Sequence, residues 1–126
     1  MKLFIDSGNL KEIEALVPLG IIDGITTNPS LLAKEGGDYR ALLKRICDIV
    51  DGPVSGESVG LTRDEIVREG LELAEIAPNV CVKVPLIWDG LKACRTLTGE
   101  GIKVNVTLCF SPAQALLAAK AGATFV

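Results

Sequence analysis

Short β-rich runs alternate with longer helical patterns along the whole chain, and this alternation limits the possible folds more than any other feature. The expected strands lie at residues 2–6, 23–27, 54–59, 80–85 and 103–110, and a sixth begins at 124. At least one helical pattern follows each of the first five. Such alternation implies a parallel sheet with right-handed crossovers. Two α/β folds satisfy it: an open doubly wound sheet, and a parallel (β/α)8 TIM barrel.

Several helices carry start signals in the sequence. Asn9 and Glu12 have the spacing of a capping box, and so do Thr62 and Glu65. Ser111 is expected to cap the last helix, with a proline in the first turn behind it. These signals predict that helices begin directly after Asn9, Thr62 and Ser111.

Size and composition indicate a globular protein and exclude several classes of partner. The 126 residues suffice for a single domain, 1–126, with a real core, and 48% hydrophobic against 23% charged residues excludes disorder. A net charge of -3 gives no reason to expect nucleic acid or an anionic membrane as partner. No apolar run approaches the roughly 18 residues of a membrane span, and the N-terminus has no signal-peptide core. We therefore expect a soluble, cytoplasmic protein.

Residue types that are absent or isolated narrow the chemistry further. The chain has no histidine, so acid–base steps must use Asp, Glu, Lys, Tyr or Cys. It has no GxGxxG motif and no P-loop, so nucleotide binding has no support. The four cysteines form no CxxC pair and are expected to be buried, reduced thiols rather than disulfides or metal ligands. They are Cys47, Cys81, Cys94 and Cys109.

Polar side chains stand near the C-terminal ends of the expected strands. In a barrel these ends converge on one mouth, where barrel active sites lie. An open sheet would rarely need a polar group on every strand, so the pattern favours the barrel. The residues are Asp6, Thr26, Asn28, Glu57, Lys83, Asn105 and Thr107.

Lys83 is the most unusual of these residues, because it interrupts the strand-like run NVCVKVP. Strand alternation places it on the face opposite the three valines. A partly desolvated amine is driven towards its neutral form, which can attack a ketone and form a Schiff base. The iminium then accepts electrons when a neighbouring C–C bond breaks. The alternative is a lysine that extends to water or pairs with a carboxylate.

Two carboxylates and a threonine could supply the proton transfers that this chemistry needs. Asp6 could take a proton from a substrate hydroxyl. Glu57 could exchange protons with a water molecule that Thr107 helps to hold. Asn28 and Asn105 could bind substrate hydroxyls. The alternatives are a turn or helix cap for Asp6, a salt bridge to the strand lysine for Glu57, and local backbone hydrogen bonds for the asparagines.

The two largest aromatic side chains have no assigned role in this scheme. Trp88, the sole tryptophan, follows the fourth strand and is expected to pack. Tyr39 lies on a helical pattern and has no evident catalytic role.

Five stretches resemble the transaldolases, in particular their small, short-chain subfamily, which is related to the fructose-6-phosphate aldolases. They are FIDSGNL, GITTNPSLLAKEG, VSGESV, CVKVP and KVNVTLCFSPAQALLAAKAGA. The resemblance implies a TIM barrel whose fourth strand carries the Schiff-base lysine. A glutamine is expected in the aldolases where this chain has Glu57, so the glutamate favours a transaldolase over an aldolase-like lyase.

The resemblance also implies an activity. The enzyme would transfer a dihydroxyacetone unit from a ketose phosphate, either sedoheptulose 7-phosphate or fructose 6-phosphate, to an aldose phosphate in the non-oxidative pentose phosphate pathway. It would need no metal or organic cofactor, and the full-length protein would be a homo-oligomer. The implied catalytic residues are Lys83 as nucleophile, Asp6 as acid/base, Glu57 as acid/base through a water, and Thr107 as the group that positions that water. The implied substrate-binding residues are Asn28, Thr26 and Asn105.

The length departs from a complete barrel, which needs at least about 200 residues. We therefore expect an N-terminal part of a TIM barrel, with about the first five β/α units and the start of strand six. The family's phosphate-gripping arginine and serine fall outside such a part. The alternative to an enzyme is a non-catalytic half-barrel that only assembles or aggregates.

Overall fold

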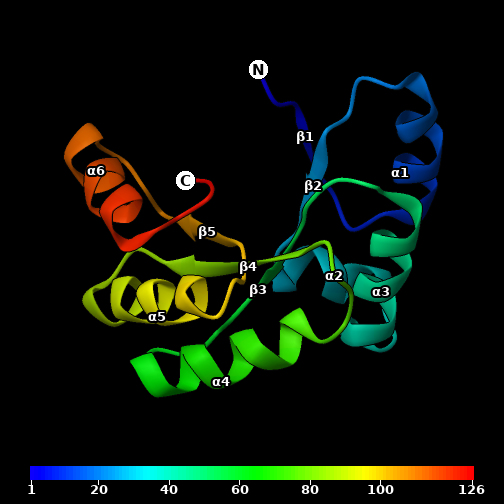
Figure 1. Cartoon of the computed structure of the whole chain (residues 1–126). Helices are drawn as coiled ribbons and strands as arrows, with labels where there is room; N and C mark the ends of the chain where they lie inside the picture. Colours follow the sequence, from blue (N-terminus) through cyan, green and yellow to red (C-terminus); the bar gives the residue numbers. More distant parts are fainter.

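The computed structural model describes all 126 residues and contains one parallel, five-stranded sheet. The strands lie side by side in chain order, and the sheet curls into half of a barrel (Figure 1). This sequential order excludes the doubly wound alternative and confirms the barrel-type prediction. The strands are β1 (Phe4–Asp6), β2 (Gly24–Thr26), β3 (Val54–Glu57), β4 (Val80–Pro85) and β5 (Val104–Thr107).

The helices lie on the outer, convex side of the sheet (Figure 1). Two helices lie between β2 and β3, and α1 (Leu10–Leu16) continues into a short 3₁₀ turn, η1 (Val17–Leu19). The start of a sixth strand is confirmed as a single parallel bridge between Phe125 and Asn105. The helices are α1 (Leu10–Leu16), α2 (Pro29–Glu35), α3 (Tyr39–Ile49), α4 (Arg63–Ala74), α5 (Trp88–Gly99) and α6 (Pro112–Ala121).

The predicted helix caps are present with one exception. Thr62 and Glu65 form the complete capping box, and the Ser111 hydroxyl caps α6. At α1, Asn9 accepts a hydrogen bond from the Glu12 amide, but the expected return bond from the Glu12 carboxylate is absent. That carboxylate accepts a bond from the Ser7 hydroxyl instead. The capping-box prediction is therefore half wrong at α1.

Four of the five strands are shorter than predicted, and only β4 matches its predicted range. β2 loses one residue at each end, and β3 ends at Glu57 rather than at residue 59. β1 begins at Phe4 rather than at residue 2, because Leu3 donates its amide to the Asp23 side chain. β5 ends at Thr107 rather than at residue 110, because Leu108 has a φ of 64°. A left-handed backbone at a leucine breaks the extended conformation and turns the chain towards α6.

The core lies between the sheet and the helices. Val80, Val82 and Val84 of β4 all point into it, as the alternation of the strand predicts. Gly70 lets α4 approach α5 closely, since a Cβ there would lie 2.8 Å from a Leu97 methyl carbon. The helix-facing side of the sheet is therefore tightly packed, and polar groups must project from its other side.

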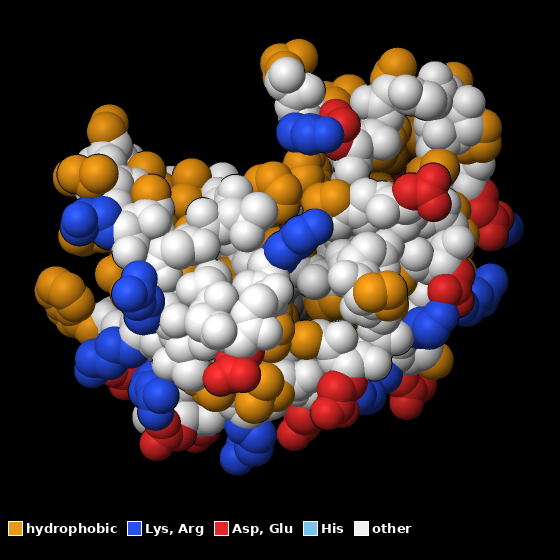
Figure 2. Space-filling model, in the orientation of Figure 1, with side chains coloured by type: hydrophobic (Ala, Val, Ile, Leu, Met, Phe, Trp, Pro, Cys, Tyr) orange, Lys and Arg blue, Asp and Glu red, His pale blue; other side chains and the backbone are white.

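The concave side of the sheet is open. Figure 2 shows the hollow between the two ends of the half-barrel, with hydrophobic side chains on its floor and rim. Leu108, Phe110 and Val126 are exposed near this side. No helix of the structure combines the length and the apolar character that a membrane crossing requires.

Two packing predictions need correction. Trp88 is 78% exposed at the start of α5, so its expected packing role is wrong. All four cysteines are free, and three of them are buried, but Cys109 is only half-buried and lies on the concave side. It follows the left-handed Leu108, where the strand pattern that would have buried it has already ended.

Candidate active site

The strand register assembles the polar residues in two layers on the concave face. Residues paired across a parallel sheet project to the same side. One layer contains Glu57 of β3, Lys83 of β4 and Asn105 of β5, which are paired in that order. The other layer starts with Asp6 of β1, which is paired with Thr26 of β2. Residues far apart in the sequence thus meet because each stands near the end of its strand.

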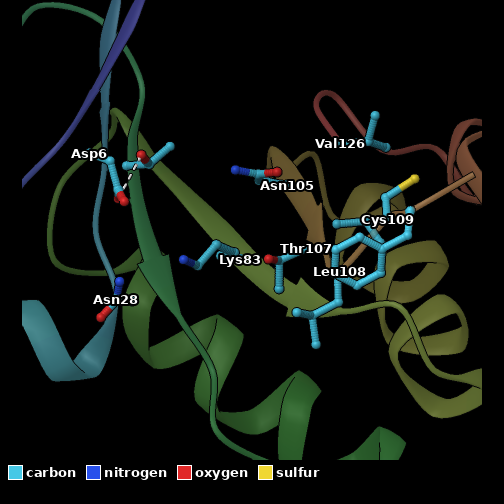
Figure 3. Close-up of a pocket in the computed structure, with 11 residues that line it drawn as sticks. Asp6, Asn28, Lys83, Asn105, Thr107, Leu108, Cys109 and Val126 are labelled. Atoms are coloured by element: carbon cyan, nitrogen blue, oxygen red, sulfur yellow. Dashed lines mark hydrogen bonds between the residues drawn. The ribbon is translucent and has the colours of Figure 1, made fainter.

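An open cavity of about 530 Å³ lies over these layers. Figure 3 shows Lys83 pointing from β4 towards the side that carries Asp6 and Asn28, with Asn105 and Thr107 around it. Six of the seven predicted site residues line this cavity: Asp6, Thr26, Asn28, Lys83, Asn105 and Thr107. The seventh, Glu57, lines a smaller cavity of about 200 Å³. Its carboxylate forms an ion pair with Lys83, which lines the main cavity.

Lys83 is buried in the half-barrel and does not extend to bulk water. The residue is 9% exposed, and its Nζ lies 3.0 Å from Glu57 Oε2. Nζ also donates a hydrogen bond of 2.6 Å to the carbonyl oxygen of Thr27. The pairing anticipated as an alternative for Glu57 is therefore present. The carbonyl oxygen and the carboxylate are both acceptors, and together they hold the amine in place.

Asp6 has a different environment from Glu57. It is exposed at the end of the edge strand β1, and it accepts a hydrogen bond of 3.0 Å from the Thr26 hydroxyl. The cap of α1 is Asn9, so the alternative interpretation of Asp6 as a helix cap is wrong. Its carboxylate is left on the cavity wall with one hydroxyl partner.

The two asparagines serve different local purposes. The Asn28 side chain accepts a hydrogen bond of 2.9 Å from the Leu31 amide and so caps α2, as the local alternative predicted. Asn105 instead donates across the sheet to the Ser55 hydroxyl at 3.2 Å. Both side chains still line the cavity.

One wall of the cavity is apolar. Its lining on the β5 side includes Leu108, Phe110 and Val126, beside the half-buried Cys109. Figure 3 shows this group facing the polar residues across the cavity. A ligand there would meet hydrogen-bonding groups on one side and hydrocarbon on the other, an arrangement common in small-molecule sites.

The sequence interpretation missed several residues that support the site. The Tyr39 phenol accepts a hydrogen bond of 3.2 Å from the Glu57 amide, and burial raises the pKa of that phenol. The Thr27 hydroxyl is fully buried and donates to the Ser55 carbonyl at 2.6 Å. Tyr39 belongs to a helix, and no periodic pattern relates it to a strand end. Only the packed structure could reveal its contact.

A curled parallel sheet with an inward lysine and polar groups at its strand ends defines the class: a barrel-type α/β protein. A family model described as Transaldolase/Fructose-6-phosphate aldolase matches residues 3–126. The chain therefore belongs to the transaldolase/fructose-6-phosphate aldolase family, as its motifs predicted.

Curated relatives match the whole chain closely. A "Probable transaldolase" of Sorangium cellulosum (strain So ce56) is 62% identical over 126 residues, and one of Paracoccus denitrificans (strain Pd 1222) is 58% identical over the same length. Each match covers 100% of this chain and 58% of the relative. The chain thus spans a little under three fifths of the length of these relatives.

A solved structure supports the fold independently of sequence. A crystal structure of 2,3-dimethylmalate lyase, a PEP mutase/isocitrate lyase superfamily member, aligns with a TM-score of 0.65 at 15% identity. The alignment covers 97% of this chain and 56% of that one. At this identity the likeness concerns the arrangement of strands and helices alone.

Proposed function

We propose that the chain carries the Schiff-base centre of a transaldolase. The observation that carries the proposal is the buried Lys83 amine, 3.0 Å from the Glu57 carboxylate, at a cavity that Asp6 and Asn105 also line. An amine that is shielded from water and has a proton acceptor in contact is suited to nucleophilic attack on a ketone. The names of the relatives support the same reaction class.

Lys83 and Glu57 would carry out the first stage. Glu57 Oε2 is within direct reach of a proton on Nζ. The neutral amine then attacks the ketone carbon of the substrate and forms a carbinolamine. Glu57 returns the proton to the former carbonyl oxygen, which leaves as water and generates the iminium. Thr107 lines the same cavity and is proposed to position that water.

Asp6 would carry out the second stage. Its carboxylate takes the proton of the substrate hydroxyl on the far carbon of the bond that breaks. The electrons of that C–C bond pass into the iminium and give an enamine, while the aldehyde leaves. The enamine adds to the acceptor aldehyde, Asp6 returns its proton to the new hydroxyl, and hydrolysis frees Lys83. The Thr26 hydroxyl donates a hydrogen bond to Asp6 and would hold this carboxylate in place.

The proposed substrates follow from the family. We propose that a dihydroxyacetone unit moves from sedoheptulose 7-phosphate or fructose 6-phosphate to an aldose phosphate, as in the non-oxidative pentose phosphate pathway of the cytoplasm. Asn28, Thr26 and Asn105 would bind the sugar hydroxyls. The complete protein is proposed to act as a homo-oligomer without metal or organic cofactor. An aldolase-like lyase is the second candidate, because the family description names both activities.

Borohydride trapping with fructose 6-phosphate tests the proposal. Reduction of the iminium converts it to a stable secondary amine, which intact mass and peptide mapping locate. We expect an adduct on Lys83 that Lys83→Met abolishes. The matched control is Lys103→Met, an exposed lysine directly before β5 and outside the cavity. An adduct on Lys103, or none in a folded sample, would contradict a Schiff-base centre at Lys83.

An acceptor sugar distinguishes the two enzyme classes. A transaldolase retains the three-carbon unit on Lys83 until an aldose phosphate takes it, whereas a lyase releases free dihydroxyacetone. We expect release to depend on added aldose phosphate. Rapid release of dihydroxyacetone without an acceptor would favour the lyase.

A further inference from the structure

We propose that Ser58 and Glu69 are positioning residues that hold the Glu57 carboxylate against the Lys83 amine. This inference rests on the proposed function, in which Glu57 exchanges protons with Lys83. Neither residue lines the main cavity. They act on Glu57 through the chain segment that directly follows it.

Ser58 is fixed by three hydrogen bonds. Its amide donates to the Lys83 carbonyl at 3.0 Å, so the backbone stays joined to β4 one residue beyond Glu57. Its hydroxyl donates to Glu69 Oε2 at 2.7 Å and accepts a bond from the Gly60 amide at 3.3 Å. The side chain is buried, so water does not compete for these bonds.

Glu69 connects this segment to α4. Its Oε2 accepts hydrogen bonds from the Ser58 hydroxyl, from the Val59 amide at 2.9 Å and from the Gly60 amide at 3.0 Å. An ionised carboxylate forms stronger hydrogen bonds than a neutral acceptor. One side chain of the helix thereby fixes three consecutive residues after the strand.

Strand alternation explains why this arrangement controls Glu57. Successive side chains in a strand point to opposite faces. Ser58 points towards the helices, so Glu57 must point into the half-barrel, where it meets Lys83. If the Ser58 anchor is released, the last residue of β3 is free to rotate and its carboxylate can leave the amine.

The same arrangement recurs at the other carboxylate of the site. Ser7 follows Asp6, is buried, and donates to Glu12 of α1 at 2.6 Å. Its hydroxyl accepts a bond from the Asn9 amide at 3.0 Å, and its amide donates to the Thr26 carbonyl at 3.1 Å. All three hydrogen bonds found at Ser58 are therefore repeated at Ser7, 51 positions earlier in the chain (58 − 7).

The other three strands lack this arrangement. After β2, the Thr27 hydroxyl donates to a backbone carbonyl of β3 and not to a helix carboxylate. After β4 and β5 come Leu86 and Leu108, which have no hydroxyl. The serine–glutamate pair thus occurs only on the two strands that end in a carboxylate facing the site. This coincidence points to a role in the chemistry rather than in general sheet stability.

Acetylation of Lys83 by acetic anhydride, without any sugar, tests the inference. The reagent attacks an amine that is free of its contacts. The Lys83 amine is held in an ion pair with Glu57 at 3.0 Å, so moving Glu57 away frees the amine and speeds the labelling. We expect Glu57→Gln to speed labelling of Lys83 about tenfold or more, and Ser58→Ala about threefold. Ser58→Thr, which keeps the hydroxyl, is expected to restore the parent rate. Peptide mass spectrometry supplies the rates, with exposed Lys120 as internal reference.

Matched controls separate positioning from folding. Ser30→Ala and Glu75→Gln alter exposed residues of the same types and are expected to leave labelling of Lys83 unchanged. Each variant is compared with the parent by circular dichroism and Tm. If Ser58→Ala does not fold, Glu69→Gln tests the same pair with the side-chain size kept, and is expected to speed labelling about twofold because it loses the charge-assisted bonds.

The outcomes separate this inference from the proposed function. Parent-rate labelling in folded Ser58→Ala and Glu69→Gln variants would overturn the positioning role, and so would a Ser58→Thr variant as fast as Ser58→Ala. Faster labelling without any borohydride adduct in the parent would support the positioning of Glu57 while the transaldolase proposal fails. Faster labelling with an adduct would support both.

Discussion

The ends of β1 and β3 are built alike, yet their carboxylates are held very differently. Both strands end in an inward carboxylate followed by a buried serine that donates to a helix glutamate. Glu57 has strands on both sides, and its side chain is 22% exposed against Lys83. Asp6 is exposed, on an edge strand with one neighbour. The serine anchors are alike in both places, so the difference between the two carboxylates comes from the second neighbouring strand, which β3 has and β1 lacks.

This difference divides the proposed reaction between two regions. The central strands β3 and β4 hold the groups needed for Schiff-base formation, whereas the edge strand β1 holds the base for C–C cleavage. Conditions that loosen β1 should therefore slow C–C cleavage, whereas they should leave borohydride trapping at Lys83 nearly unchanged. The following predictions test this contrast, beginning with the largest effect.

Alkaline pH should unfold the central region as a whole. Burial raises the pKa of Cys81 to about 12, and those of Cys47 and Cys94 to about 11, from an ordinary value of 9.0. The folded state thus keeps protons that the unfolded chain loses, so the stability is complete below pH 9 and falls as the pH rises towards 12. We expect a cooperative loss of circular dichroism over this range. The Cys81→Ala variant should lose less stability between pH 9 and 11 than the parent; an equal loss would contradict the role of this thiol.

Glu57→Gln and Asp6→Asn should separate the two stages. Glu57→Gln removes the proton acceptor of Lys83 and should slow adduct formation with fructose 6-phosphate by about 100-fold. Asp6→Asn should leave trapping within about twofold of the parent but slow aldehyde release by about 100-fold. Rapid-quench borohydride trapping gives the first rate, and a coupled assay for glyceraldehyde 3-phosphate gives the second. If both variants slowed trapping equally, Glu57 and Asp6 would not act in separate stages of the reaction.

Core substitutions should show the same contrast in stability. Val82 is fully buried at the centre of the sheet, and Ile5 is half-buried on the edge strand. Val82→Ala should lower the free energy of unfolding by about 2 to 3 kcal/mol, whereas Ile5→Ala should lower it by about 1 kcal/mol. Urea denaturation at pH 7 measures both. A larger loss for Ile5→Ala would mean that the edge strand is as firmly packed as the centre.

Tyr39→Phe should produce the smallest effect. It removes the phenol oxygen that accepts the Glu57 amide and should cost about 1 kcal/mol of stability. Because the ring remains, packing against the core is retained. Denaturation gives the stability, and amide exchange at Glu57 should quicken in the variant. Unchanged exchange at this amide would show that the hydrogen bond does not persist in solution.

The sequence predicted the architecture well because its signals are local. Strand and helix periodicity, together with caps at Thr62 and Ser111, placed each element, and strand alternation gave the direction of Lys83. Boundaries failed where a single residue decided them, as at Leu108. The exposure of Trp88 was missed because nothing nearby in the sequence reports which side of α5 faces the core.

Strand-end positions predicted which residues gather at the cavity, but not the contacts between them. Strand-end positions identified the residues, since parallel strands align their ends. The ion pair between Glu57 and Lys83 was only one of the predicted alternatives. The distance between these two side chains depends on the register of β3 against β4, which the sequence does not show. Ser58 and Glu69 could not be found from spacing, because the serine lies one residue after the site and faces the other way.

The register that assembles the site also sets the order in which it can form. The bond from Lys83 to Thr27 spans 56 residues of chain, and that from Asn105 to Ser55 spans 50, more than any other side-chain hydrogen bond in the molecule. Contacts between distant residues form late in folding, because long loops must close first. Helices and their caps can appear early, while the amine meets its carbonyl partner only when three successive β/α units have docked. The contacts that surround the proposed nucleophile are therefore absent from a nascent or partly folded chain.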